Sequence, residues 1–335
     1  MESKNFVQHP PKRGEKRKFA VGLDVGGTSL KSAIVSSDGA ILNNSFKKRP
    51  FNSQGSAESI IETFFQTSNL YRKMAERLGI EIAGIGIGMP GPFDYEKGVC
   101  LIPPRLHKFG KLYGLNLKQK LEDRLKLKEI RFENDAWTFL RGDAWIGKAR
   151  GCNRAIGVTL GTGVGSAFMA GNQILLKGNG VPPLGWIGGM PYENGIAEDK
   201  ISQRWVLARY KELSKQKGSV SVEEIARRGK QLQDRASLET FKEMGQRLGK
   251  ILKPIASNFK ADCIVFGGQI SKSFFLFSDP IKTELQLVPS LKKIAPANSI
   301  DLSPIYGAAK LIFLGSGYKP QKLVFEEGFQ KGQEF

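Results

Sequence analysis

Two glycine-rich turns of similar design could hold a chain of phosphates. The first lies in GLDVGGTSLK at residues 22–31 and the second in VTLGTGVGSAF at 158–168. Each turn follows an apolar stretch, offers backbone N–H groups that no β-carbon hinders, and includes a threonine, Thr28 or Thr162. Because the design occurs twice, two facing turns could grip a nucleotide from both sides of a cleft.

Carboxylates at the ends of apolar strands are the candidate catalytic groups. Asp24, Asp94 and Asp135 all occupy such positions, and strand ends in α/β folds converge on the ligand crevice. Asp135 could accept a proton from a bound hydroxyl. It could equally cap a helix that starts at Ala136, because Asp is a preferred capping residue.

Asp24 would face any phosphate that the first turn holds. Since two anions repel each other, this arrangement predicts a Mg²⁺ ion between them, held mainly through water molecules. The alternative is that Asp24 only stabilises the glycine turn.

The turns require flanking strands, and the apolar patterns predict them. In the first half these patterns indicate extended runs at 19–23, 31–35 and 41–48, a helix over 57–78, and strands within 80–94 and 129–137. The second half repeats the order, with extended runs within 155–175, a helical stretch over 196–259, a strand within 261–271 and a helix over 305–315. This weak internal repeat predicts two similar lobes around a cleft.

Composition restricts the class of protein. A length of 335 residues favours about two domains. No apolar run is long enough to span a membrane, and the N-terminal segment lacks the apolar region of a secretory signal, so a soluble cytoplasmic protein is expected. The three cysteines are far apart and show no zinc or redox spacing.

The chain is strongly basic, with 51 lysines and arginines against 32 acidic residues and a net charge of +19. The basic residues are spread along the whole chain, which is typical of a solvated basic surface. A groove for nucleic acid or another long polyanion is the alternative.

Six motifs, taken in order, resemble the ROK family of sugar kinases and related repressors: DVGGTSLK, GIGIGMPGPFD, FENDAW, TLGTGVGSAF, IVFGGQIS and a late GAA. The resemblance extends from Phe19 to about Gly315. It implies an α/β fold of two actin-like, ribonuclease H-like lobes, each a mixed β-sheet flanked by helices, with an interdomain cleft.

The resemblance also implies a division of the chain. The expected parts are a disordered basic extension at 1–18, a small N-terminal lobe at 19–136 completed by the helix near 305–318, a large C-terminal lobe at 137–304, and a tail at 319–335.

By the same resemblance, both turns belong to a nucleotide site. The residues that it assigns to ATP are those of the turns, the lysine after the first turn and a Gly-Gly pair beside the adenosine: Asp24, Gly26, Gly27, Thr28, Lys31, Gly161, Thr162, Gly163, Gly267 and Gly268. Asp24 would orient Mg²⁺, so the implied cofactor is Mg²⁺ with ATP.

A sugar site is implied as well. Asp135 would be the general base that takes the proton from a sugar hydroxyl while this hydroxyl attacks the γ-phosphate. Asn134 and Gly91 would orient the ring. The implied substrate is a hexose, as in glucokinases, and the implied assembly is a homodimer.

One segment departs from the family pattern. Family kinases usually carry Glu-x-Gly-His after the second turn, followed by cysteines that bind structural zinc. Here Trp186 stands at the glutamate position, Gly189 at the histidine position, and Pro191 and Ile196 at cysteine positions, so no zinc site is expected. Glu198 still matches a sugar-facing carboxylate, and Trp186 either stacks on a sugar face or fills a smaller pocket.

Three functions remain open. Intact turns, Asp24 and Asp135 favour an ATP-dependent sugar kinase, and the net charge fits a variant that uses polyphosphate as the donor. A repressor would need a helix-turn-helix before Phe19, where only 18 residues stand, so no specific DNA binding is expected. A sugar-binding regulator without catalysis is suggested by Trp186 and Gly189, and the retained Asp135 argues against it.

Overall fold

The structure is a computed structural model that describes residues 17–106, 108–127, 129–216, 218–315, 318, 320 and 321. The chain divides into two compact units: one takes in the chain up to Asp135 and from Ala308 onward, and the other is Ala136–Gly307. The sequence predicts divisions after residues 136 and 304. The predicted extension at 1–18 and tail at 319–335 lie outside the described residues, apart from residues 17, 18, 320 and 321.

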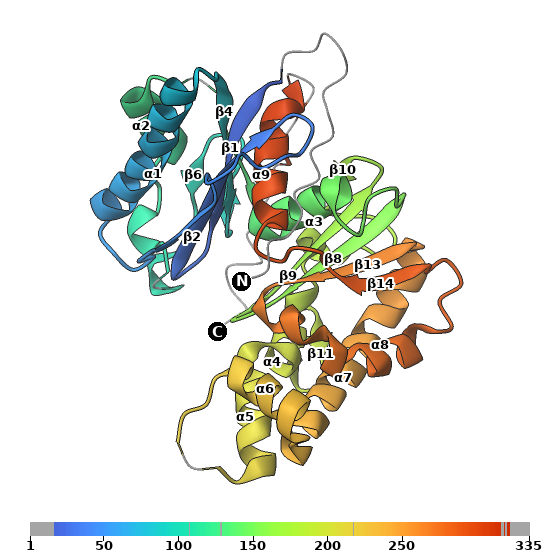
Figure 1. The fold of residues 1–335 in the computed structure, drawn as a ribbon. Coiled ribbons are helices and arrows are strands. Elements are labelled where there is room, and N and C mark those ends of the chain that lie inside the picture. The colour runs from blue at the N-terminus through green and yellow to red at the C-terminus, as the bar shows by residue number, and fades with distance from the viewer. Residues whose placement is uncertain are drawn as a thin grey trace. The chain divides into compact units, whose positions relative to one another are not determined.

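A five-stranded mixed sheet forms the centre of the first unit (Figure 1). Its strands, in spatial order, are β3 (Lys47–Pro50), β2 (Ser29–Ser36), β1 (Phe19–Val25), β4 (Ile82–Met89) and β7 (Ile130–Asn134). The first three strands form an antiparallel meander, and β4 and β7 run parallel to β1. The last six residues of β4 are all buried, as expected for a parallel strand that is covered on both faces.

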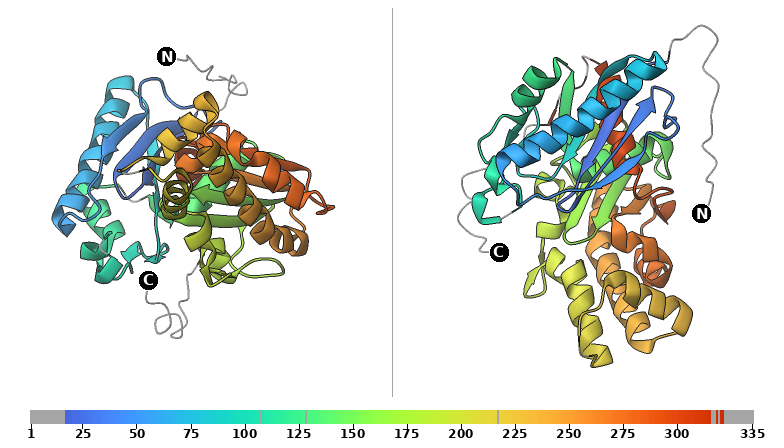
Figure 2. Two further views of the ribbon diagram at one scale, coloured as in Figure 1. Left: turned by 90° about the horizontal axis from the view of Figure 1, so that it is seen from below. Right: turned by 60° about the vertical axis from the view of Figure 1, so that its left-hand side comes forward.

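Helices cover both faces of this sheet. On one face lie α1 (Ala57–Leu78) and α2 (Leu117–Leu125), and on the other lies the second half of α9 (Ser303–Phe313) (Figure 1). The right-hand view of Figure 2 shows α1 running across the strands. The hydroxyl of Ser56 caps the start of α1 by accepting a hydrogen bond from the Ser59 amide, and Gly79 ends the helix in a left-handed conformation. The helix predicted over 57–78 is therefore confirmed.

The second unit contains a sheet of the same design. Its spatial order is β10 (Gln173–Ile174), β9 (Val164–Ala170), β8 (Arg154–Leu160), β13 (Cys263–Gly267) and β14 (Lys293–Pro296). Again three antiparallel strands are followed by two strands parallel to the first of them. The equal order confirms the internal repeat and the α/β class with two mixed sheets flanked by helices.

The faces of the second sheet are also covered. Helix α3 (Asp135–Ile146) packs its Phe139 and Leu140 side chains against the glycines of β8 and β13. The opposite core is built from buried side chains of the sheet and of α7 (Arg235–Phe259), and α8 (Ser278–Leu285) adds to it. In this core the rings of Phe168 and Phe259 meet edge to face at 5.2 Å between centroids.

The helical stretch predicted over 196–259 consists, in its described residues, of four helices. These are α4 (Ala197–Ile201), α5 (Gln203–Ser214), α6 (Val222–Leu232) and α7. Lys215 and Gln233 end α5 and α6 in left-handed conformations, which interrupts the helical hydrogen bonding.

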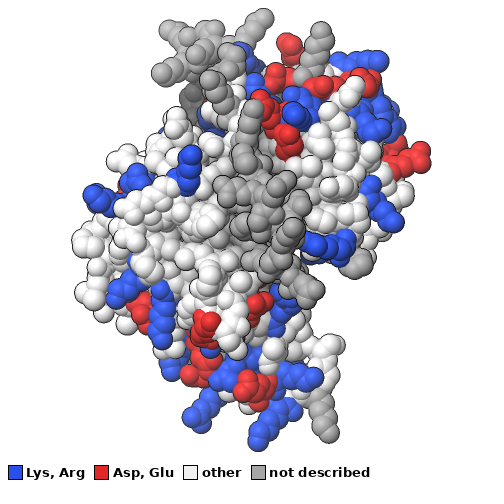
Figure 3. Space-filling view, turned by 180° about the vertical axis from the view of Figure 1, so that it is seen from behind, with Lys and Arg blue, Asp and Glu red and all other residues white. Residues whose placement is uncertain are grey.

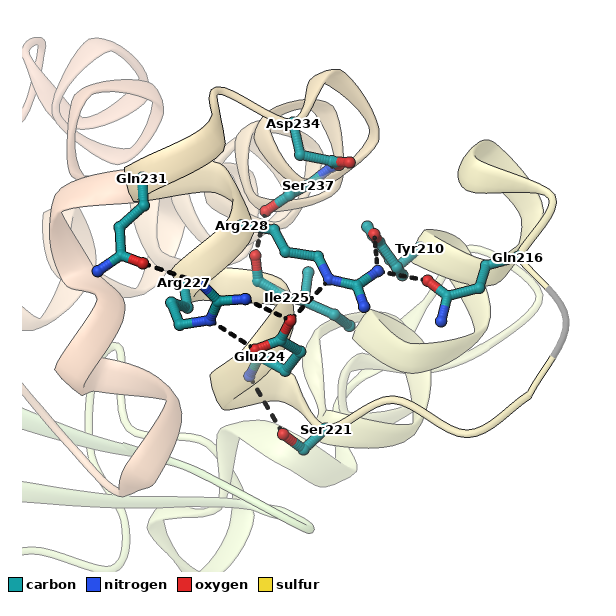
Figure 4. Close-up of polar contacts among 10 residues, drawn as sticks. All are labelled: Tyr210, Gln216, Ser221, Glu224, Ile225, Arg227, Arg228, Gln231, Asp234 and Ser237. Carbon is teal, nitrogen blue, oxygen red and sulfur yellow. Dashed lines mark hydrogen bonds and ion pairs between the residues drawn. The ribbon is translucent and has the colours of Figure 1, made fainter.

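A polar network connects α5 and α6 (Figure 4). The Glu224 carboxylate accepts hydrogen bonds from Arg227 at 2.7 Å and from Arg228 at 2.8 Å. Arg228 also donates to the hydroxyl of Tyr210 on α5 at 3.0 Å. Glu224 thus orients an arginine that joins the two helices.

The prediction of a third extended run over 41–48 is wrong for most of this segment. Asn44 takes a left-handed conformation with φ of 61° and reverses the chain. Only Ile41 forms an isolated bridge, to Val35, and β3 begins at Lys47.

Short elements complete the fold. They are β5 (Phe93–Asp94), β6 (Val99–Cys100), β11 (Pro191–Tyr192), β12 (Gly195–Ile196) and the 3₁₀ helices η1 (Pro104–Leu106), η2 (Gly110–Leu112), η3 (Pro183–Gly185), η4 (Ile187–Gly189) and η5 (Gln269–Leu276). Within the described part of the chain, no helix is long and apolar enough to cross a membrane. On the face drawn in Figure 3, basic and acidic side chains are interspersed.

Candidate functional site

The first glycine turn, residues 26–28, joins β1 to β2 and is fastened through its carbonyl groups. The carbonyl of Gly27 accepts a hydrogen bond from the Ser53 amide at 3.2 Å, and that of Thr28 accepts one from the Phe51 amide at 3.0 Å. Among the described residues, the amides of Gly27 and Thr28 have no hydrogen-bond acceptor. The turn therefore offers donors, which is the polarity that an anion requires.

Asp24 and Lys31 form an ion pair beside this turn. They are directly opposite in the β1–β2 ladder, and Lys31 Nζ lies 3.2 Å from Asp24 Oδ2. Both side chains are largely buried, with exposed fractions of 11% and 14%. The structure thus brings together two residues that the sequence assigns to the phosphates, and the lysine balances the charge of the aspartate.

A magnesium ion beside Asp24 stays a prediction. No group of three or more His, Cys, Asp or Glu side chains that could hold a metal is found among the described residues. Mg²⁺ beside a nucleotide needs only one or two carboxylates, because phosphate oxygens and waters supply the other ligands. Asp24 would be the carboxylate that holds it.

Strand register places Asp24 and Asn134 at the same edge of the first sheet. Asp24 pairs with Gly88 of β4, and the next residue of β4, Met89, pairs with Asn134 at the end of β7. One strand lies between them, so the two backbones are about 10 Å apart, which is two strand spacings.

Asn134 is held by a buried tyrosine that the sequence analysis missed. Asn134 Nδ2 donates to the hydroxyl of Tyr95 at 3.1 Å, and this hydroxyl donates to the carbonyl of Met89 at 3.1 Å. A β-carbon on Gly91 would lie 3.0 Å from the same hydroxyl. Burial, with a smaller effect of the Asp135 and Glu133 charges, raises the pKa of Tyr95 well above its ordinary value. The sequence signal that could have indicated this residue is a tyrosine three positions after Pro92.

Asp135 is the first residue of α3 and directly follows β7. Its side chain is at an intermediate level of exposure, and the helix N-terminus favours a negative charge at this position. Asp94 has a different role, because its Oδ1 accepts a hydrogen bond from the Lys97 amide at 2.9 Å within the β5–β6 hairpin. A catalytic role of Asp135 stays a prediction.

The second glycine turn, residues 161–163, is fastened by Gln203. The hydroxyl of Thr162 donates to Gln203 Oε1 at 3.2 Å, and the Gln203 amide donates to the carbonyl of Gly161 at 2.9 Å. Gln203 is the first residue of α5, so this helix supports the turn.

Glu198 supports the same turn from α4. Its Oε2 accepts a hydrogen bond at 2.8 Å from the amide of Val164, the first residue of β9. Its Oε1 lies 3.6 Å from Arg204 Nη2, and 21% of the side chain is exposed. The carboxylate expected to face the sugar therefore has one oxygen bound to the backbone of the turn.

Trp186 and Gly189 depend on each other. The indole Nε1 of Trp186 donates to the carbonyl of Val164 at 2.8 Å. A β-carbon on Gly189 would lie 2.4 Å from ring atoms Cε3 and Cζ3, and one on Gly188 would lie 2.6 Å from Nε1. The indole thus lies against the backbone of two glycines, and a side chain at position 189 would require it to move.

Gly267 and Gly268 lie next to the second turn. Gly267 is opposite Thr159 in the β8–β13 ladder, and a β-carbon on it would enter the ring of Phe139. Gly268 has φ of 80°, and a β-carbon there would lie 2.2 Å from the carbonyl oxygen of Leu160. Packing explains both glycines, and their contact with adenosine stays a prediction.

The predicted site residues thus form two groups in each unit. In the first unit these are the first turn with Asp24 and Lys31, and Gly91 with Asn134 followed by Asp135. In the second unit Glu198 and Trp186 both contact Val164 beside the second turn, and Gly267 and Gly268 lie against the end of β8. Ser53 and Gln203 escaped the sequence analysis, because a backbone contact from a remote segment leaves no local motif.

The sequence pattern of the ROK family matches residues 20–313. Glucokinases of Thermotoga maritima and Halalkalibacterium halodurans are 24% and 26% identical to this chain, and the matches cover 87% and 93% of it and 96% and 98% of those proteins.

A solved ROK family glucokinase of Streptomyces griseus, in complex with glucose and AMPPNP, is similar in fold. The TM-score is 0.71 at 24% identity, and the match covers 89% of this chain and 100% of that one. Because the family pattern spans nearly the whole of both sheets and their helices, the chain belongs to the ROK family.

Proposed function

We propose that this protein is a sugar kinase that transfers the γ-phosphate of ATP to a hydroxyl of a hexose. One observation carries the proposal: register across β1, β4 and β7 puts the first glycine turn and Asp135 at one edge of one sheet. A phosphate held at the turn and a hydroxyl held near Asp135 would then be within reach of each other. The relatives that are named glucokinases support the choice of reaction and of a hexose.

In the proposed reaction, Asp135 takes the proton of the attacking sugar hydroxyl. Asn134, oriented by Tyr95, and the Gly91 loop position the ring. The amides of Gly27 and Thr28 bind phosphate oxygens. Positioning and charge neutralisation supply most of the acceleration in such transfers.

Mg²⁺ held at Asp24 would neutralise charge on the phosphate chain. Gly161, Thr162 and Gly163 would bind the same chain, and Gly267 with Gly268 would border the adenosine. Glu198 would reach the sugar through Oε1, since its Oε2 is bound to the turn. The contacts of Trp186 with Gly188 and Gly189 favour a space-filling role, and hence a smaller pocket. The family resemblance further favours a cytoplasmic homodimer.

A non-catalytic sugar-binding regulator is the second candidate, because Trp186 and Gly189 replace two side chains of the family pattern. A kinase that uses polyphosphate is a variant of the first candidate, favoured by the net charge of +19.

A coupled ADP-release screen over hexoses, amino sugars and polyols tests the proposal, with polyphosphate as an alternative donor and sugar phosphate measured directly in that arm. Turnover with ATP and one hexose is expected. If binding of a sugar is detected and no acceptor is phosphorylated with either donor, the regulator replaces the kinase. If sugar is phosphorylated with polyphosphate and not with ATP, the protein is the polyphosphate-using kinase.

A further inference from the structure

Lys108 lies over the first glycine turn. A β-carbon on Gly27 would lie 3.4 Å from Lys108 Cε and 3.5 Å from Cδ, so the end of this side chain is in contact range of the turn. Lys108 is exposed, and its ammonium has no ion pair or hydrogen bond with any residue that the structure describes. Lys31, the other lysine beside the turn, is paired with Asp24. Lys108 therefore brings an uncompensated positive charge to the turn.

The backbone fixes where Lys108 stands. The Ser53 amide donates to the carbonyl of Gly27, and the carbonyl of Ser53 accepts a hydrogen bond from the Phe109 amide at 2.6 Å. Phe109 is buried, and its ring packs on that of Phe51 at 5.9 Å between centroids. Because the residue after Lys108 is anchored in the core, Lys108 is held next to the turn.

The chemistry of this arrangement matches a linear chain of phosphates. Amides of Gly27 and Thr28 act as donors to phosphate oxygens, and an ammonium group adds a point charge with three further donors. The carbonyls of Gly27 and Thr28 already accept hydrogen bonds from the amides of Ser53 and Phe51, so the turn has its amides to offer to a ligand.

We propose that Lys108 is a phosphate-binding residue, whose ammonium binds an oxygen of the phosphate chain held at the first glycine turn. This inference rests on the proposed function for the assignment of the turn to a phosphate donor. The ligand class is a linear phosphate chain, as present in ATP and in inorganic polyphosphate.

Titration calorimetry tests this without turnover. Mg·ATP and tripolyphosphate are titrated into the wild type, K108M and K108R at low and at moderate salt. Lys111→Met is the matched control, because Lys111 is an exposed lysine three residues further on, without a described partner. Circular dichroism and melting curves check that each variant is folded.

K108M is expected to weaken binding of at least one of the two ligands about 10-fold, the size of one charged hydrogen bond. K108R and K111M should stay within about 2-fold. The deficit of K108M should shrink as salt rises, because the lost contribution is electrostatic. A loss for both ligands or for either one alone supports the role of Lys108, and the ligand that is affected identifies the source of the chain.

Equal binding by K108M and the wild type would overturn the inference, and so would an equal loss in K111M. The proposed kinase activity is judged separately. If tripolyphosphate binding depends on Lys108 and no sugar is phosphorylated, Lys108 keeps its role and the kinase is rejected.

Discussion

The two glycine turns stand on sheets of the same strand order, and they are held in place by different means. The first is fastened by backbone amides of the neighbouring residues Phe51 and Ser53. The second is fastened by the side chain of Glu198 and by both the side chain and the backbone amide of Gln203, which come from two helices of the long connection between β10 and β13. The first turn can thus form within its own sheet, whereas the second depends on α4 and α5.

The charges beside the two turns differ as well. Asp24 stands two residues before the first turn and pairs with a glycine of the neighbouring parallel strand. The equivalent position before the second turn is Thr159, which pairs with Gly267 in the same way. The repeated fold therefore supplies two similar backbones, and the position two residues before the turn carries a charged side chain in only one of them.

The largest effect is expected at Asp135, in the unit that also contains Asp24. D135N should lower kcat by about 10² to 10⁴, the usual contribution of a positioned general base. D94N is the matched control, because Asp94 only accepts the Lys97 amide in a hairpin. Steady-state kinetics and melting curves of both variants check this. Full activity of D135N would remove this residue from the proposed chemistry.

The next largest effect is expected on protein stability, when the contact between Trp186 and Gly189 is changed. G189A adds a methyl group 2.4 Å from the indole ring and should cost about 1–3 kcal/mol, as overpacking does. In a W186A background this cost should largely disappear. Urea unfolding of both single variants and the double variant measures the coupling, and additive effects would mean that the indole does not restrict position 189.

Glu198 tests whether the second turn depends on a side chain. E198A leaves the amide of Val164 without its acceptor and should lower the free energy of unfolding by about 1–2 kcal/mol, the lower end for a charged hydrogen bond. E198Q keeps an oxygen acceptor and should stay close to the wild type. Urea unfolding compares them. If E198A is as stable as the wild type, Glu198 does not support the turn. If E198Q is stable and has a raised KM for the sugar, Glu198 also takes part in sugar binding.

The smallest effect is expected on stability at Glu224 of α6, one of the helices that only the second unit contains. Arg227 and Arg228 hold the pKa of Glu224 at about 2, below its ordinary value of 4.5 (Figure 4). The folded state thus favours the carboxylate, which contributes stability above about pH 4.5 and loses it as the pH falls through about 2.

The variant E224Q lacks this contribution. Its melting temperature should be slightly lower than that of the wild type at pH 7, and the difference should vanish between about pH 4.5 and 2. Added salt should reduce the difference at pH 7. A difference that stays constant from pH 7 to pH 2 would contradict the assignment.

Long periodic patterns made much of the fold predictable. The helix at 57–78, the strands on both sides of each turn and the internal repeat follow from the spacing of apolar residues. The run at 41–48 was wrong because Asn44 reverses the chain. Strand β14 was not predicted, since its four residues are all only partly buried and show no alternation. Helices α2 and α8, of nine and eight residues, were too short to stand out.

For the site, sequence motifs indicated the turns and the carboxylates but not what holds them. Glu198 and Trp186 are separated from Val164 by 34 and 22 residues. Their contacts with Val164 form only when the connection between β10 and β13 has folded. Lys108 lay in a basic segment whose charges look alike in the sequence, and its place over Gly27 is set by the anchoring of Phe109.

The hydrogen bonds of Tyr95 have a direction. Its hydroxyl has one proton, which it gives to the carbonyl of Met89, so it must accept the proton of Asn134 Nδ2. This fixes which way round the amide of Asn134 stands, with Oδ1 as its acceptor atom. A ligand group at Oδ1 must then be a proton donor. A sugar hydroxyl satisfies this condition, and the corresponding deoxy, fluoro or keto compound does not.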